Sequence, residues 1–146
     1  MRPLGSRNFG TLLRDPWLEL NARLTQAVTQ RGFDDIRPAL SVVFQHLRDE
    51  GSRITEIADR AQLTKQTVVY LVNELEHLGY LERIPDPSDG RAKLVRPTAR
   101  GHAAVAEARR IAAEIEHDWS QLLGHAPMGE LRRLLEQLHD ALWPPA

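Results

Sequence analysis

Apolar residues recur along most of the chain at the three- and four-residue spacing of amphipathic helices. In the first third of the chain this spacing predicts two helices. The first begins at Asp15-Pro16, where Asp suits the N-cap and Pro the first helical position, and ends at Arg31-Gly32. The second spans roughly Arg37 to Asp49 and stops near Gly51. Its apolar positions are Leu40, Val43, Phe44 and Leu47.

Two further helices follow in close succession. Thr55 is the expected cap of a short one, and after a turn at residues 61–63, Thr64 caps a longer one that ends at Gly79. At about 100° per residue, one side of the longer helix is apolar. The residues on that side are Val68, Leu71, Val72, Leu75 and Leu78.

The pattern then changes to the alternation of a strand over residues 80–84, interrupted by Pro85. A loop over residues 85–90 and a second short strand over residues 93–96 complete a predicted hairpin. Thr98 begins a long helix, and after Gly124 and Pro127 a last helix runs to Pro144-Pro145. The two apolar stripes consist of Ala104, Ala108, Ile111, Ile115, Trp119 and Leu122, and of Leu131, Leu134, Leu135, Leu138 and Leu142.

A short helix, a tight turn, a longer helix and a hairpin form the order of a winged helix-turn-helix. The expected fold class is mainly α with a small β-hairpin wing (α+β), flanked by N- and C-terminal dimerisation helices. We expect one domain over residues 1–146, with a DNA-binding lobe at 34–100 and a dimerisation lobe at 11–32 and 101–143. The terminal helices carry much apolar surface, including Leu12, Leu13, Leu18 and Leu20. A twofold dimer explains this surface, and the alternative is that it closes a monomeric helical core.

Length and composition narrow the class of protein. At 146 residues, with 42% hydrophobic and 27% charged residues, the chain fits one globular domain. It has no apolar run near the roughly 20 residues that cross a bilayer, and its first residues do not have the pattern of a secretory signal. Cysteine is absent, which removes disulfides, thiol catalysis and thiol redox sensing and fits a cytoplasmic location. We expect no membrane partner.

The net charge of −1 gives no overall preference for nucleic acid, so any DNA contact depends on local charge. Between residues 83 and 100 there are five cationic residues and two acidic ones, an excess of three positive charges. Because the rest of the chain must carry the opposite excess, the charge is polarised along the sequence.

The outward side of the longer helix is the candidate for reading DNA bases. Amides can pair with adenine in the major groove, while hydroxyls and Lys reach phosphates or base edges. The alternative is that these side chains are ordinary solvated polar positions. The candidate residues are Thr64, Lys65, Gln66, Thr67, Tyr70 and Asn73, with His77 on the same side.

The hairpin is the second candidate surface. Arg91 lies at its tip, where its side chain can extend into a narrow minor groove with enhanced negative potential. Asp89 cannot contact DNA by charge, and we expect it to orient a neighbouring Arg or to cap the turn. An ordinary charged turn is the alternative. The candidate wing residues are Arg83, Ser88, Asp89, Arg91 and Lys93.

Five stretches resemble the MarR family of transcriptional regulators. The stretches at 79–83, 86–91 and 98–101 (GYLER, DPSDGR and TARG) resemble its wing, and those at 54–58 and 63–68 (ITEIA and LTKQTV) resemble its helix-turn-helix. The resemblance implies that the helix from Thr64 to Leu78 lies in the major groove and that Arg91 reaches the minor groove. One departure is Pro97, where the family usually has Leu, and we expect it to shorten the second wing strand.

The resemblance also implies a homodimer on a pseudo-palindromic operator and a small aromatic or lipophilic effector. The expected function is that of a sequence-specific DNA-binding regulator, a ligand-responsive repressor without a cofactor. Candidate pocket residues are Trp17, Phe44 and His46, with Trp119 as a weaker one; each has the alternative of being an ordinary core side chain.

Two other classes of function stay open. A winged helix can bind protein instead of DNA, without operator specificity. Two Glu-x-x-His motifs, Glu114…His117 and Glu136…His139, occur in di-metal helical enzymes. In this chain His117 and Glu136 lie away from the apolar stripes of their helices, so we expect neither an enzyme nor a metal site.

Overall fold

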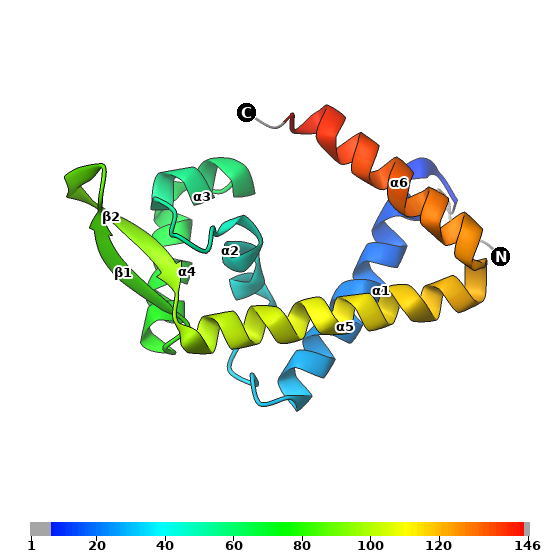
Figure 1. Cartoon of the computed structure of the whole chain (residues 1–146), viewed down its shortest axis with the longest axis horizontal. Helices are drawn as coiled ribbons and strands as arrows, with labels where there is room; N and C mark the ends of the chain where they lie inside the picture. The colour runs from blue at the N-terminus through cyan, green and yellow to red at the C-terminus, as the bar shows by residue number, and fades with distance from the viewer. Residues whose placement is uncertain (1–6, 145–146) are drawn as a thin grey trace.

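The computed structural model describes residues 7–144, which form six α-helices, one 3-10 helix and one two-stranded antiparallel hairpin (Figure 1). The ends of the expected 1–146 domain, including Pro145, lie outside the described residues. In chain order the elements are α1 (Phe9–Gln30), η1 (Pro38–Leu40), α2 (Ser41–His46), α3 (Ile54–Ala61), α4 (Lys65–His77), β1 (Leu81–Asp86), β2 (Asp89–Pro97), α5 (Ala99–Leu123) and α6 (His125–Leu142). No helix within residues 7–144 combines the length and apolar character needed to span a bilayer.

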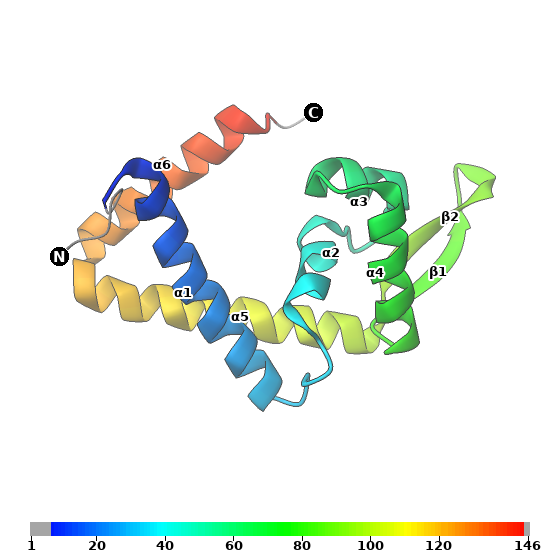
Figure 2. The ribbon, with the colours of Figure 1, turned by 180° about the vertical axis from the view of Figure 1, so that it is seen from behind.

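The elements gather at two ends of the long helix α5. We call residues 38–97, from η1 to β2, the winged-helix lobe; its hairpin projects from the far end of the molecule (Figure 1). We call α1, α5 and α6 the helical lobe. In this lobe α1 crosses α5, and α6 turns back from the end of α5 (Figure 2). Arg23 of α1 pairs with Asp118 of α5 at 2.5 Å, and Arg31 pairs with Glu107.

The hydrophobic core belongs mainly to the winged-helix lobe. The predicted apolar side of α4 is confirmed, because Val68, Leu71, Val72 and Leu75 are all buried, and Leu78 packs against the same core. The other buried members of this core are Leu40, Val43, Ile57, Ala58, Tyr80, Leu81, Val95 and, from α5, Ala104.

The hairpin is longer than the sequence suggests. β1 continues through Pro85 to Asp86, and β2 begins at Asp89 instead of residue 93. The expectation that Pro97 shortens the second strand is wrong, since Pro97 pairs with Leu81 at the strand end. There the missing N–H of proline breaks no ladder that continues beyond it. Ser52 adds an antiparallel bridge to Val95, with both backbone hydrogen bonds at 2.9 Å.

Two of the predicted helix starts are confirmed. The Thr64 hydroxyl accepts from the Thr67 N–H at 3.1 Å, and the Thr98 hydroxyl accepts from the Gly101 N–H at 3.2 Å. Both satisfy a donor that the first helical turn leaves unpaired.

Four predicted helix boundaries are wrong, one of them at the last helix, because α6 begins at His125 and contains Pro127 in its first turn. The first helix starts before Asp15, because Asn8 accepts from the Thr11 N–H at 2.9 Å and Pro16 lies inside α1. The third helix follows Arg53, not Thr55, and Glu56 accepts from the Arg53 N–H at 3.2 Å. The second helix ends at His46, because Leu47 is extended and the chain turns toward the Ser52 bridge.

A tight contact fixes the start of α5 against the hairpin. A Cβ atom on Gly101 would lie 2.2 Å from the Tyr80 carbonyl oxygen, so only glycine fits there. The hydroxyl of buried Tyr80 donates to Asp35, which also accepts from Arg100 at 2.9 Å. The Arg100 guanidinium lies 4.2 Å from the centroid of the Tyr80 ring. These contacts join the loop before η1, the hairpin and α5 into one unit.

Candidate nucleic-acid interface

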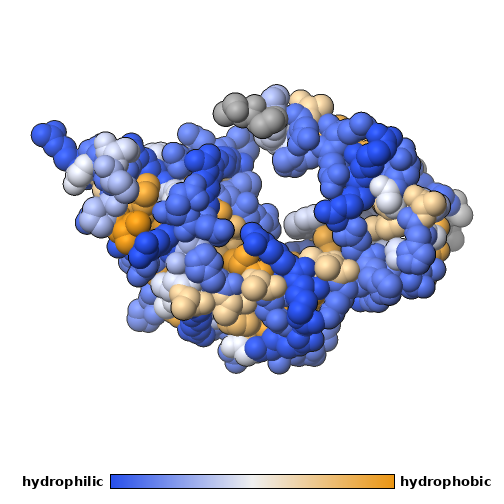
Figure 3. All heavy atoms as spheres, in the orientation of Figure 1, coloured by the Kyte–Doolittle hydropathy of each residue, from blue (hydrophilic) through white to orange (hydrophobic). Residues whose placement is uncertain are grey.

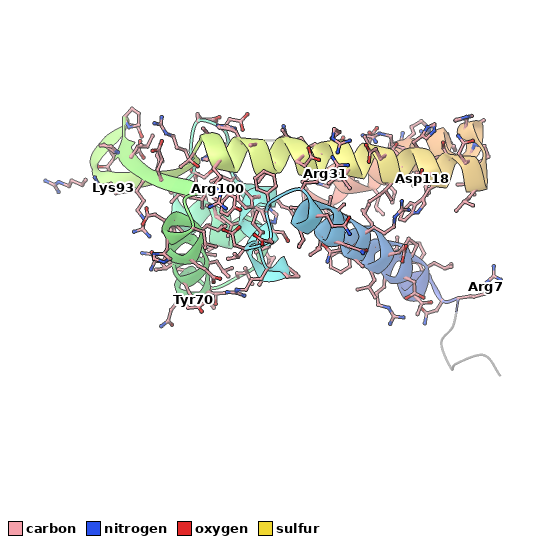
Figure 4. The ribbon with its side chains drawn as sticks, turned by 90° about the horizontal axis from the view of Figure 1, so that it is seen from below. Arg7, Arg31, Tyr70, Lys93, Arg100 and Asp118 are labelled. Carbon is pink, nitrogen blue, oxygen red and sulfur yellow. The ribbon has the colours of Figure 1, made fainter. Side chains whose placement is uncertain are left out.

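The outward side of α4 is polar and open to solvent, opposite its buried face. Gln66, Asn73 and His77 are exposed, and Tyr70 is 65% exposed. Figure 4 shows Tyr70 at the outer edge of the helix, directed away from α5. These four side chains share one side of the helix at positions that amides and a phenol can use to contact base edges or phosphates.

The first turn of α4 divides the candidate residues into two kinds. The hydroxyls of Thr64 and Thr67 lie 2.8 Å apart, and Thr64 also caps the helix. Lys65 and Gln66 are exposed, and their side chains make no hydrogen bond or ion pair within residues 7–144. The two threonines therefore stabilise the helix start, while Lys65 and Gln66 can reach a partner.

The base of the hairpin contacts the polar, exposed side of α4. Arg83 of β1 donates to the Asn73 side-chain oxygen and lies 3.4 Å from the Glu76 carboxylate. Two predicted DNA contacts, Asn73 and Arg83, are thus joined to each other. Asn73 keeps its amide donors, so a two-bond contact to adenine requires Arg83 to share or release the oxygen.

The turn of the hairpin is built around Asp86, which is only 6% exposed. It accepts from the Ser88 N–H at 2.8 Å, from the Ser88 hydroxyl at 2.7 Å and from Arg53 at 2.8 Å. These bonds, those from Ser88 first, lower the pKa of Asp86 to about 2. Asp86 is therefore an ionised anchor that holds the shape of the turn.

Of the two roles expected for Asp89, the structure shows the cap of the turn, and the arginine near its carboxylate is not the neighbouring one. Asp89 accepts from the Arg91 N–H at 3.1 Å, which caps the turn, and its carboxylate lies 3.8 Å from Arg53. The arginine that it orients is thus Arg53, from the segment before α3, and not Arg91. The Arg91 side chain makes no hydrogen bond or ion pair within the described part of the chain.

The local positive charge is placed differently from what the sequence count indicates. Three of its five cations are neutralised: Arg83 by Glu76, Arg96 by Glu82 at 2.7 Å and Arg100 by Asp35. Among the candidate cations, those without a carboxylate partner within residues 7–144 are Lys65, Arg91 and Lys93. They lie at the start of α4 and along the wing, whose outer end carries Lys93 (Figure 4). Unpaired positive charge thus flanks the polar, exposed side of α4.

A cavity of about 450 Å³ lies between α1, the 36–47 segment and the first half of α5. Its apolar wall includes Leu24, Val28, Ile36, Phe44, Leu47 and Ala108. Of the predicted pocket residues, Phe44 lines this cavity, while Trp17 and His46 do not. Trp17 is 56% exposed on α1. Burial, with Arg60 nearby, lowers the pKa of His46.

Trp119 lines a second, more open cavity of about 600 Å³ between α1, α5 and α6. The two Glu-x-x-His motifs do not converge on a site. Glu114 pairs with Arg110, and Glu136 pairs with Arg132 at 3.0 Å. Within residues 7–144 no group of three or more His, Cys, Asp or Glu side chains is arranged to hold a metal ion.

Four residues of this region were missed in the sequence. Arg53 and Asp86 shape the wing turn, and Arg37 and Glu74 form an ion pair beside α4. The Asp-x-Ser spacing of residues 86–88 is a turn signal that identifies Asp86. The partners Arg53 and Arg37 lie more than thirty residues from their carboxylates, and no local pattern shows such pairs.

A model of the MarR family matches residues 37–92, which cover the winged-helix lobe from before η1 to the wing turn. The chain is also 25% identical over 140 residues to the exopolysaccharide II synthesis transcriptional activator ExpG of Rhizobium meliloti (strain 1021). That match covers 94% of this chain and 66% of the relative, so the chain spans slightly less than two thirds of the relative's length.

Solved structures with the same fold cover nearly the whole chain. CouR from Rhodococcus jostii RHA1 bound to p-coumaroyl-CoA has a TM-score of 0.74 at 23% identity, with 100% of this chain and 99% of that chain covered. CouR bound to a 23-mer DNA duplex has a TM-score of 0.69 at 22% identity, covering 95% and 99%. The regulator Tm0710 from Thermotoga maritima has a TM-score of 0.63 at 22% identity, covering 92% and 93%. The chain therefore shares the fold of these winged-helix regulators.

Proposed function

We propose that the chain is a MarR-family winged-helix transcriptional regulator, which binds a pseudo-palindromic operator as a homodimer and acts as a ligand-responsive repressor. The observation that carries the proposal is the exposed polar side of α4, flanked by the unpaired cations Lys65, Arg91 and Lys93. We place this activity in the cytoplasm, without a cofactor. DNA reading belongs to residues 34–100, and dimerisation to residues 11–32 and 101–143.

In this proposal α4 lies in the major groove. Gln66 and Asn73 contact base edges, and Lys65 and Tyr70 contact phosphates or base edges. The hydroxyls of Thr64 and Thr67 hold the first turn, so its free N–H groups face the backbone of the duplex. Arg83 moves from the Asn73 oxygen to the DNA when Asn73 pairs with a base.

The wing reaches the neighbouring minor groove. Asp86, Ser88 and Asp89 fix the turn, and this leaves the Arg91 side chain free to enter the groove, with Lys93 near the phosphates. A turn that is already ordered lowers the conformational entropy that Arg91 loses on binding.

The homodimer rests on the helical lobe. Of the fourteen exposed large hydrophobic residues within residues 7–144, thirteen lie in α1, at the end of α5 or in and directly after α6, and Tyr70 is the other. A patch of this extent is typical of an interface. Figure 3 shows an opening between the winged-helix lobe and α6. Two copies related by a twofold axis would cover the apolar faces and present two α4 helices to one duplex.

The effector site is the 450 Å³ cavity, which lies where the helical lobe meets the winged-helix lobe. Its size is within the range of small-molecule sites, and Phe44 supplies an aromatic wall. The fold neighbour CouR binds p-coumaroyl-CoA, which supports a small aromatic or lipophilic effector for this chain. The relative ExpG is named an activator, so transcription of a reporter from the selected operator is the test of repression.

The test of DNA binding is selection from a pool of random duplexes, followed by affinity measurements against salt concentration. We expect two half-sites about one helical turn apart and a Kd that rises steeply with salt. Arg91→Ala should weaken binding of the selected duplex by about tenfold or more, as one lost groove contact does.

Arg96→Ala is the matched control, because Arg96 lies on the same strand but is paired with Glu82. It should bind DNA almost as the wild type does. Absence of any enriched sequence would contradict the proposal and favour a winged helix that binds protein.

A further inference from the structure

Arg37 connects the effector cavity with the DNA-reading helix. It lines the cavity, yet its guanidinium donates to Glu74 of α4, from Nε to Oε1 at 2.8 Å and from Nη2 to Oε2 at 2.5 Å. The guanidinium also lies 5.9 Å from the centroid of the Tyr70 ring, within the range of a cation–π contact. One side chain therefore contacts both the cavity and two residues of α4.

The charge of the cavity lining has one sign. Its charged residues within the described chain are Arg37 and Arg109, and no Asp or Glu lines it. Arg109 makes no ion pair within residues 7–144. Most of the remaining wall is apolar. Such a cavity fits a molecule with an apolar body and one anionic group better than a neutral or cationic molecule.

The pair between Arg37 and Glu74 is open to exchange. The two side chains are 44% and 29% exposed, and solvent-exposed ion pairs contribute only about 0–1 kcal/mol. A second anion on the cavity side of Arg37 would form the same two-bond contact with the guanidinium fork. It would gain, in addition, the burial of its apolar body.

We propose that the cavity binds a small amphipathic anion, and that the carboxylate or phosphate group of this ligand replaces Glu74 as the ion-pair partner of Arg37. This inference rests on the proposed function, because the exchange regulates the DNA contact of the same helix. Arg37 lowers the pKa of Glu74 against the opposing effect of burial. Because the ordinary pKa of a Glu carboxyl lies well below neutral pH, we expect this partly exposed side chain to stay ionised when Arg37 leaves.

The exchange weakens DNA binding through two residues of α4. The unpaired Glu74 carboxylate adds a negative charge beside the surface that faces the phosphates. Tyr70, one turn earlier on the same side of the helix, loses the cation that lies over its ring. A ligand therefore needs no shift of a whole helix to lower the affinity for DNA.

The first experiment measures ligand class by calorimetry, with 4-hydroxycinnamate and its uncharged methyl ester as probes. The wild type should bind the carboxylate more tightly than the ester. Arg37→Gln should weaken carboxylate binding by about tenfold or more, as expected for loss of a charge-assisted pair, and leave ester binding unchanged. Arg110→Gln is the matched control, because Arg110 is ion-paired on α5 but does not line the cavity.

Three outcomes would overturn the proposal: equal binding of acid and ester by the wild type, an unchanged preference in Arg37→Gln, or no binding of either probe. None of them depends on DNA. The proposed function is tested by the duplex selection, so failure of the two can be distinguished.

The second experiment measures affinity for the selected duplex without any ligand. Arg37→Gln should weaken DNA binding by about three- to tenfold, the effect of one uncompensated charge near the phosphates. Adding Glu74→Gln to that variant should restore part of the affinity, because the unpaired carboxylate is then gone while Tyr70 still lacks the Arg37 cation. A double variant that binds no better than the single one would contradict the exchange.

Discussion

The two lobes use their apolar residues in opposite ways. In the winged-helix lobe, α4 buries Val68, Leu71, Val72 and Leu75 against residues of the same chain. In the helical lobe, α1 and α6 contain no buried residue, although α6 carries five leucines on one side. The first lobe is complete within one chain, and the second has apolar faces that a single chain does not cover. The comparison separates the residues that stabilise a single chain from those that we propose to form the dimer interface.

The charges divide in the same way. In the helical lobe the arginines of α6 pair with carboxylates of α5 and α6, as Arg132 does with Glu116 at 2.5 Å and Arg133 with Glu130 at 2.5 Å. At the reading surface Lys65, Arg91 and Lys93 stay unpaired within the described residues. Unpaired cations beside a polar helix face suit a polyanion, whereas paired charges around an apolar face suit a protein partner.

The largest effect is expected from truncation of a buried side chain in the core of the winged-helix lobe. Leu75→Ala removes a side chain with no exposed surface and should lower the free energy of unfolding by about 2–5 kcal/mol. Urea unfolding at several protein concentrations should give the same loss each time. Leu135→Ala on α6, 46% exposed in one chain, is the comparison. If a second copy covers Leu135, the loss of unfolding free energy in this variant should depend on the protein concentration. The same concentration dependence in both variants would contradict the distinction between the lobes.

The next effect concerns assembly. Leu134→Glu/Leu138→Glu places two charges on the apolar side of α6 and should leave a monomer with the circular dichroism of a folded winged helix. Sedimentation measures its mass. Gln137→Glu adds a charge to the polar side of the same helix and should leave the wild-type mass unchanged. A double variant that stays dimeric would move the interface away from α6.

Local sequence signals predicted the parts of the fold that depend on neighbouring residues. The caps Thr64 and Thr98 and the buried side of α4 follow from spacing alone. The start of α1 was predicted wrongly. Asp15-Pro16 has the pattern of a helix start, but the helix already begins at Phe9. The end of α2 also escaped prediction, because its cause is the bridge from Ser52 to Val95, far along the chain.

The candidate site was predicted as a set of residues but not as a set of contacts. Net charge over a segment treated Arg83, Arg96 and Arg100 as equal to Arg91 and Lys93, whereas carboxylate partners neutralise the first three and leave Arg91 and Lys93 unpaired within the described residues. The pair of Arg37 and Glu74 spans 37 positions and has no sequence signature. Pairings of this kind arise from tertiary packing, and a single sequence does not show them.

A smaller effect is expected at the start of α4. Thr64→Ala removes the cap and should lower the free energy of unfolding by about 0.5–2 kcal/mol at every protein concentration. Thr64→Ser keeps the hydroxyl and should recover most of the loss. Equal destabilisation by both substitutions would mean that the cap does not hold this turn.

The smallest effect concerns the pH dependence of the wing. The pKa of Asp86 is about 2 in the folded chain against an ordinary 3.8, so its contribution to stability is present above the ordinary value and is lost as the pH falls toward 2. Asp86→Asn should therefore be less stable than the wild type at pH 7, and the difference should shrink below pH 4, measured by thermal unfolding. Asp49→Asn, at an exposed position without an ion pair in the described chain, should show no such change. A constant difference for Asp86→Asn would contradict its role as an ionised anchor.

Sedimentation equilibrium of the wild type with the selected duplex tests the account most directly, because it combines DNA reading by one lobe with assembly by the other. We expect two chains on each duplex at saturation, and no stable complex of one chain of the Leu134→Glu/Leu138→Glu variant with the same duplex at that concentration. A wild type that saturates the duplex with one chain, or a monomeric variant that binds as tightly as the wild type, would contradict the account.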